Sequence, residues 1–60
     1  MFEVGQRVKI HGDVTDFTDH LDGMTGTVVK AGSEDCRVMV DDINNFGIGW
    51  MIWNRNLTHV

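Results

Sequence analysis

The sequence predicts an all-β domain, a small antiparallel barrel of five short, strongly bent strands. Apolar and polar residues alternate in several short runs, and turn-forming residues separate these runs. No segment shows a long helical period or an apolar stretch of membrane-spanning length. A chain of 60 residues has room for one domain, which we place at residues 1–60.

The first two strands are expected in the N-terminal half of the chain. "RVKIH" (residues 7–11) alternates, with Val8 and Ile10 on one face and charged residues on the other. "TGTVVKA" (25–31) is rich in β-branched residues, and glycines suited to tight turns surround its beginning. The first run therefore predicts a half-buried strand, and the second run predicts another strand.

The C-terminal half predicts three further strands. "CRVMV" (36–40) and "IGWMIW" (48–53) both alternate. We expect these two strands to contribute five core residues: Val38, Val40, Ile48, Trp50 and Ile52. "NRN" (54–56) predicts a short 3₁₀ turn, and "LTHV" (57–60) predicts a closing strand with Leu57 facing inward.

A long acidic segment, "DVTDFTDHLDG" (13–23), follows the first strand and lacks strand patterning. Its apolar residues Val14, Phe17 and Leu21 have the spacing of a turn or two of helix, which Thr15 could cap. We favour a long loop that folds over the barrel, with Phe17 or Leu21 tucked beneath it.

Charge and composition restrict the function. Nine acidic and five basic residues give a net charge of −4, and no Lys or Arg lies between Ile10 and Val29. An acidic face disfavours nucleic acid and favours a protein partner with a basic patch. The aspartates of the loop lack the alternating spacing of a calcium loop, and the histidines lack a tight ligand pair. We expect no metal and no cofactor.

Catalysis is also not expected. Cys36 is the single cysteine and is interpreted as a small apolar residue packed in or beside a strand. Ser33 is the only serine and lies in a turn. A chain of this size offers no deep cleft in which a nucleophile and a base could meet. We therefore expect a non-enzymatic, cytoplasmic protein, complete from Met1, that is a monomer or a weak homodimer and does not bind membranes.

Three segments together resemble a known family: "VGQRVKI", "DGMTGTVVK" and "CRVMVDD". They are similar to the Src-homology-3-like barrels, in particular the KOW-like branch. The matching positions are Gly5, Val8, Ile10, Gly23, Gly26, Val28, Val38 and Val40. "WMIWNRNL" resembles the last hairpin, one-turn 3₁₀ helix and final strand of such barrels. Free-standing barrels of this size resemble small accessory proteins of bacteria and their phages.

The resemblance implies an alternative function. A KOW-like nucleic-acid-binding or ribosome- or transcription-associated domain would use the basic side chains of Arg7, Lys9, Lys30 and Arg37. The loop after the first strand is longer than in KOW motifs and is acidic, so we rank this alternative second. A further alternative is an acidic decoy that inhibits a nucleic-acid-binding enzyme of a host.

The two tryptophans suggest where a partner binds. Strand parity places Trp50 with the core residues and Trp53 on the opposite face. Trp53 lies where Src-homology-3-like domains present a residue to their peptide groove; otherwise it only covers the barrel end. The chain has no tyrosine, which disfavours a proline-rich ligand. The expected partner-binding residues combine aromatic, apolar and acidic side chains: Trp53, Met51, Phe17, Asp16 and Asp19.

Overall fold

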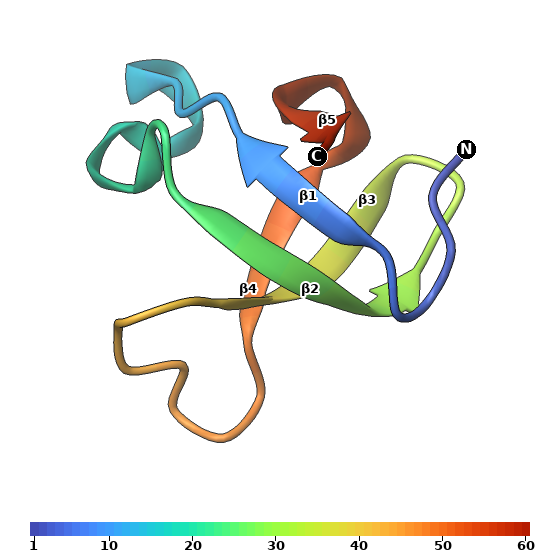
Figure 1. The fold of residues 1–60 in the computed structure, drawn as a ribbon. Coiled ribbons are helices and arrows are strands. Elements are labelled where there is room, and N and C mark those ends of the chain that lie inside the picture. The colour runs from blue at the N-terminus through green and yellow to red at the C-terminus, as the bar shows by residue number, and fades with distance from the viewer.

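The computed structural model describes residues 1–60 as one antiparallel β-sheet with short 3₁₀ helices (Figure 1). The strands are β1 (Arg7–Ile10), β2 (Thr25–Ala31), β3 (Asp35–Val40), β4 (Trp50–Trp53) and β5 (Leu57–His59). The 3₁₀ helices are η1 (Val14–Asp16), η2 (Asp19–Leu21) and η3 (Asn54–Asn56). No helix has the length and apolar character that crossing a bilayer requires. The predicted strands and the turn before the last strand are confirmed.

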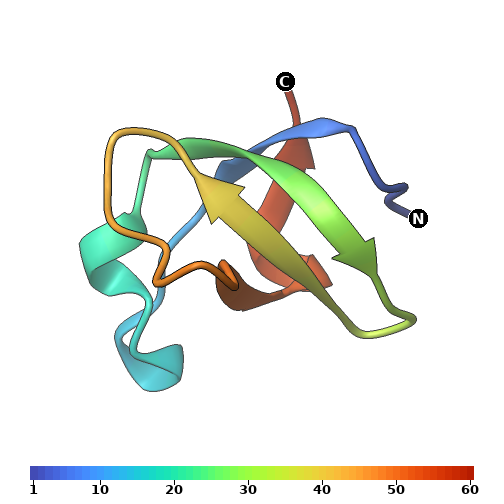
Figure 2. The ribbon, with the colours of Figure 1, turned by 90° about the horizontal axis from the view of Figure 1, so that it is seen from below.

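The strand order is β4-β3-β2-β1-β5, and all neighbouring pairs are antiparallel. No ladder joins β4 to β5, so the sheet is open and these two strands form its edges. The loop between β1 and β2 and the loop between β3 and β4 lie at the same end of the sheet (Figures 1 and 2). The β2–β3 turn and the N-terminus lie at the other end.

The core lies on one face of the bent sheet. Strand alternation turns every second residue inward, so each strand supplies one to three core side chains. Nine apolar residues are buried there: Val8, Ile10, Leu21, Val28, Cys36, Val38, Val40, Ile52 and Leu57. All but Leu21 come from strands. The predicted inward positions of the first, third and last strands are therefore confirmed, and so is the packing of Cys36.

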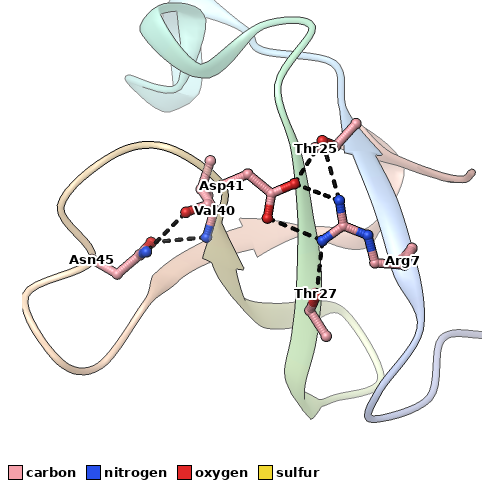
Figure 3. Close-up of polar contacts among 6 residues, drawn as sticks. All are labelled: Arg7, Thr25, Thr27, Val40, Asp41 and Asn45. Carbon is pink, nitrogen blue, oxygen red and sulfur yellow. Dashed lines mark hydrogen bonds and ion pairs between the residues drawn. The ribbon is translucent and has the colours of Figure 1, made fainter.

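The expected core position of Ile48 is wrong, because its side chain is 63% exposed. β4 begins only at Trp50, and the loop before it contains several residues of positive φ, which breaks the strand alternation. Asn45 fixes the loop: its side chain accepts from Val40 N at 2.8 Å and donates to Val40 O at 2.8 Å (Figure 3). A Cβ at Gly49 would lie 2.8 Å from Val38 O, so the chain re-enters the sheet only with glycine there.

The acidic segment folds over the end of the core as two 3₁₀ turns. Leu21 is the residue beneath it, 1% exposed, whereas Phe17 is 84% exposed. Asp13, and not Thr15, caps η1: Asp13 Oδ1 accepts from the backbone N and the hydroxyl of Thr15, both at 2.9 Å. These bonds lower the pKa of Asp13, the backbone one most strongly.

A β-bulge changes the register of β2 and sets which side chains share the solvent face. Val28 is opposite Val38, but the next pair is Lys30 with Arg37, so Val29 is the extra residue. Val29 is accordingly 42% exposed. Without the bulge the alternation of β2 would point Lys30 toward the core face.

We expect Val38→Asp to unfold the domain. Val38 is fully buried on β3, an interior strand of the sheet, and an unpaired carboxylate there would cost several kcal/mol in a domain of marginal stability. Val29→Asp is the matched control, since the same change at the exposed bulge should cost less than about 1 kcal/mol. Circular dichroism melts distinguish the two. A cooperative, wild-type-like melt for Val38→Asp would refute the assigned core.

Candidate partner-binding surface

β4 places the two tryptophans on opposite faces of the sheet. Trp53 is 38% exposed and Met51 is 58% exposed on the solvent face, while Ile52 is fully buried. Trp50 is half-buried and packs against the edge of the core. The predicted parity is therefore confirmed, although Trp50 covers the core and does not fill it.

Trp50 lies between the two loops at one end of the sheet. Its ring makes edge-on contacts with His20 at 5.4 Å and with Phe46 at 5.9 Å between centroids. Its indole nitrogen is buried without a hydrogen-bond acceptor. The aromatic contacts thus join η2 to the loop before β4, away from Trp53.

Arg55 holds the exposed indole of Trp53. Its guanidinium lies over the Trp53 ring, 5.1 Å from the centroid. Arg55 Nη2 also donates to both carboxylate oxygens of Asp16, at 3.1 and 3.0 Å. Asn56 Nδ2 donates to Asp16 Oδ2 at 2.9 Å. η3 therefore connects the acidic loop to the solvent face of β4.

The five expected partner-binding residues are only partly brought together. Met51 and Trp53 share the solvent face of β4, and Asp16 reaches Trp53 through Arg55. Phe17 follows Asp16 in the left-handed conformation, at φ 58°, and its ring contacts no other aromatic ring. Asp19 opens η2 as an exposed residue.

The sequence did not reveal the part that Arg55 and Asn56 play. They were recognised only as members of a turn, and their contact with Asp16 spans 39 and 40 residues. The only sequence signal for this arrangement is a cationic residue, Arg55, two positions after the outward-facing Trp53.

The four basic residues of the nucleic-acid alternative lie on the solvent face of the sheet. Strand alternation places Arg7 and Lys9 there from β1, and the bulge adds Lys30 opposite Arg37. Arg7 is already paired with Asp41 in a bidentate ion pair, and it donates to Thr27 Oγ1 at 3.0 Å (Figure 3). One of the four charges is thus neutralised within the chain.

The Arg7–Asp41 pair is part of a network across three strands. Asp41 also accepts from Thr25 Oγ1 at 2.9 Å. Bonds from Arg7 first, and from Thr25 second, lower the pKa of Asp41 to about 2. The Asp41 carboxylate in turn raises the pKa of Arg7. This network lies on the solvent face and joins β1, β2 and the end of β3.

A shallow hollow of about 100 Å³ lies on the same face, beside the β2–β3 turn. It is lined by Lys30, Gly32, Asp35, Arg37 and Met51, and we call it the basic hollow. Asp35 is directly opposite Trp53 in the β3–β4 ladder, so the hollow adjoins the exposed indole. No three His, Cys, Asp or Glu side chains converge as metal ligands anywhere in the structure.

The Asp41 network should make stability depend on acid. Because the pKa of Asp41 is about 2 in the folded chain and near 3.8 when unfolded, its contribution is complete above pH 4. It is lost as the pH falls from 4 to 2. Asp41→Asn should therefore destabilise the protein at pH 6 and much less at pH 2.

Urea unfolding at both pH values measures this difference. Asp42→Asn is the matched control, since the Asp42 side chain makes no hydrogen bond and asparagine tolerates its φ of 67°. An equal loss of stability for Asp41→Asn at both pH values would contradict the assigned network.

Asp16→Ala should loosen the cover over Trp53. Without Asp16, Arg55 loses the carboxylate to which its Nη2 donates and samples other rotamers, so the indole becomes more accessible. In a Trp50→Phe background, acrylamide quenching of Trp53 should rise by roughly half, since the arginine stem shields apolar surface. Asp19→Ala, in the same loop, should leave the quenching unchanged. Equal quenching in all three proteins would refute the link between Asp16 and Trp53.

No protein-family model, curated protein sequence or solved structure matches this chain significantly. The features that bear on function are those of the chain itself: its exposed apolar side chains, its ion pairs and its unpaired cations.

Proposed function

We propose that the protein is a non-enzymatic interaction module that binds a protein partner. The contact residues are Trp53, Met51, Phe17 and Arg55, which we call the Trp53 surface. The observation that carries the proposal is the indole of Trp53, 38% exposed yet held by a guanidinium that is itself fixed by Asp16. We also propose that the strongly bent open sheet is an Src-homology-3-like barrel of the KOW-like branch, which the strand order and η3 support.

A held aromatic side chain is suited to binding. Tryptophan and arginine are the residues most enriched at the energetic centres of interfaces. Because Arg55 and Asp16 already fix the indole, a partner meets little loss of side-chain freedom at this position. Met51, 58% exposed two residues away, adds a side chain that adapts to apolar groups. The aromatic side chain of Trp53 would supply affinity, and the flexible side chain of Met51 would let the surface accept partners with different apolar groups.

The acidic residues take different roles in this proposal. The Asp16 side chain is only 12% exposed and accepts three hydrogen bonds, so it positions Arg55 and does not meet the partner. Asp19 is exposed and makes no side-chain bond, so it is free to attract a basic group. Phe17, 84% exposed beside Asp16, supplies the apolar contact at the loop.

We propose no catalysis because the chain presents neither an accessible nucleophile nor a cleft that could enclose a substrate. The thiol of Cys36 is buried in β3 and donates to Asn54 Oδ1 at 3.0 Å, so it is not presented as a nucleophile. The basic hollow is too small to enclose a substrate of ordinary size. A surface that contacts a ligand without enclosing it is better suited to binding a partner protein than to catalysing a reaction.

Nucleic-acid binding remains the second candidate, because the structure gathers Arg7, Lys9, Lys30 and Arg37 on one face. The pairing of Arg7 with Asp41 and the presence of Asp35 reduce the field of that face. Micromolar binding of a single-stranded oligonucleotide near physiological salt, with a steep salt dependence, would promote this candidate over the first.

Trp53→Ala should weaken partner binding without unfolding the domain. Truncation of an aromatic anchor typically costs about 2 kcal/mol or more, which is at least a 30-fold loss of affinity. Proteins captured from a lysate by the immobilised wild-type chain are compared with those captured by the variant. The affinity of a captured partner is then measured by calorimetry.

Ile48→Ala is the matched control, an exposed apolar residue in the loop before β4 and outside the Trp53 surface. It should bind like wild type. Equal affinity of Trp53→Ala and wild type for every captured partner would refute the proposed surface, provided both variants keep the wild-type dichroism spectrum.

A further inference from the structure

The basic hollow holds two cations, Lys30 and Arg37, that form no ion pair with any acid in the chain. Lys30 and Arg37 are directly opposite in the β2–β3 ladder, yet neither makes an ion pair or a side-chain hydrogen bond. By contrast, the other two arginines are both paired, Arg7 with Asp41 and Arg55 with Asp16. Like charges directly opposite one another destabilise a sheet. The β-bulge creates this unfavourable pair by turning Lys30 to the solvent face.

The rim of the hollow is rigid. Asn54 ties it to η3: its backbone N donates to Glu34 O at 2.8 Å, and its Nδ2 donates to Gly32 O at 3.1 Å. A Cβ on Gly32 would lie 2.7 Å from Asp35 O, so the turn closes tightly only with glycine. The backbone beneath the two cations is therefore fixed before any ligand arrives.

We propose that the basic hollow binds one carboxylate, from an acidic side chain of the partner segment that docks on the Trp53 surface. This inference rests on the function proposed above. Two cations against the carboxylate of Asp35 leave one positive charge uncompensated. A single carboxylate matches that charge, and a guanidinium offers it paired N–H donors. The adjoining Met51 and Trp53 then contact apolar groups that flank the acidic residue.

A carboxylate fits the hollow better than a phosphate. A phosphate group carries close to two negative charges and would face Asp35 with more repulsion than a carboxylate. A nucleic-acid backbone needs a continued row of free cations, whereas Arg7 next along the face is bound to Asp41. The chemistry of the hollow thus favours an acidic peptide segment.

The probes that test this are the peptides acetyl-Leu-Glu-Leu-amide and acetyl-Leu-Gln-Leu-amide. Each is titrated into the ¹⁵N-labelled protein, and amide shifts are followed by nuclear magnetic resonance. The glutamate peptide should shift the amides that line the hollow, and the glutamine peptide should bind at least about fivefold more weakly, as expected for loss of a charge-assisted bond. Inorganic phosphate and a single-stranded oligonucleotide are titrated in the same way.

Arg37→Gln should weaken the glutamate peptide by at least about fivefold, while Lys9→Gln, on the same face but outside the hollow, should not. Arg37→Gln should also raise the midpoint of thermal unfolding or leave it unchanged, because it relieves the repulsion with Lys30. Equal binding of both peptides, or unchanged binding by Arg37→Gln, would overturn the proposal. Tighter binding of phosphate or oligonucleotide than of the glutamate peptide at these amides would overturn it as well.

The same titration separates this inference from the function on which it rests. The glutamate peptide should still shift the hollow amides in Trp53→Ala, because the carboxylate contacts the cations and not the indole. Failure of the peptide with Trp53-dependent capture intact would remove only the carboxylate site. Binding of the peptide without any Trp53-dependent capture would leave the hollow in place and remove the proposed interaction surface.

Discussion

The small size of the apolar core determines how the loops of this structure are held in place. Nine apolar side chains cannot bury the connections as well as the strands, so the long loops depend on polar side chains that bond to distant backbone. Asn45 holds the loop before β4, and Asn54 holds the β2–β3 turn. Asn56, 7% exposed, helps to hold the acidic loop through Asp16. Each amide replaces packing that the short chain cannot supply.

One of these polar contacts also builds the surface. The Asp16 carboxylate anchors the acidic loop on η3, and through Arg55 the same carboxylate fixes the ring of Trp53. Loop position and indole orientation are therefore set by one group, although the residues lie about 40 positions apart in the chain. The contacts that run from the loop to the face of β4 pass through Arg55 and Asp16 and not through the core residues.

The sequence predicted what depends on local alternation. The inward positions of β1, β3 and β5 and the outward position of Trp53 follow from period two alone. The predicted core position of Ile48 was wrong because residues of positive φ and the two hydrogen bonds between the Asn45 side chain and Val40 determine the loop before β4. Neither feature is visible in an alternating pattern of apolar and polar residues. Arg55 was missed because its partners are remote. The pairing of Lys30 with Arg37 was missed because it depends on a bulge, which shifts the register by one residue.

Positive and negative side chains lie on different parts of the surface, which the net charge of the chain does not show. Although the net charge of the chain is −4, the basic hollow has two cations, Lys30 and Arg37, against the one carboxylate of Asp35, and Asp19 is exposed on the acidic loop. Under the proposed function, the partner contacts Trp53 and Met51 beside the basic hollow. The acidic loop is linked to Trp53 through the contacts of Asp16 with Arg55 and of Arg55 with the indole. A partner segment with an acidic residue on one side of its apolar group and a basic residue on the other would match both charges. The reversed segment would face like charges at both positions, so under the proposed function electrostatics would favour one direction of binding.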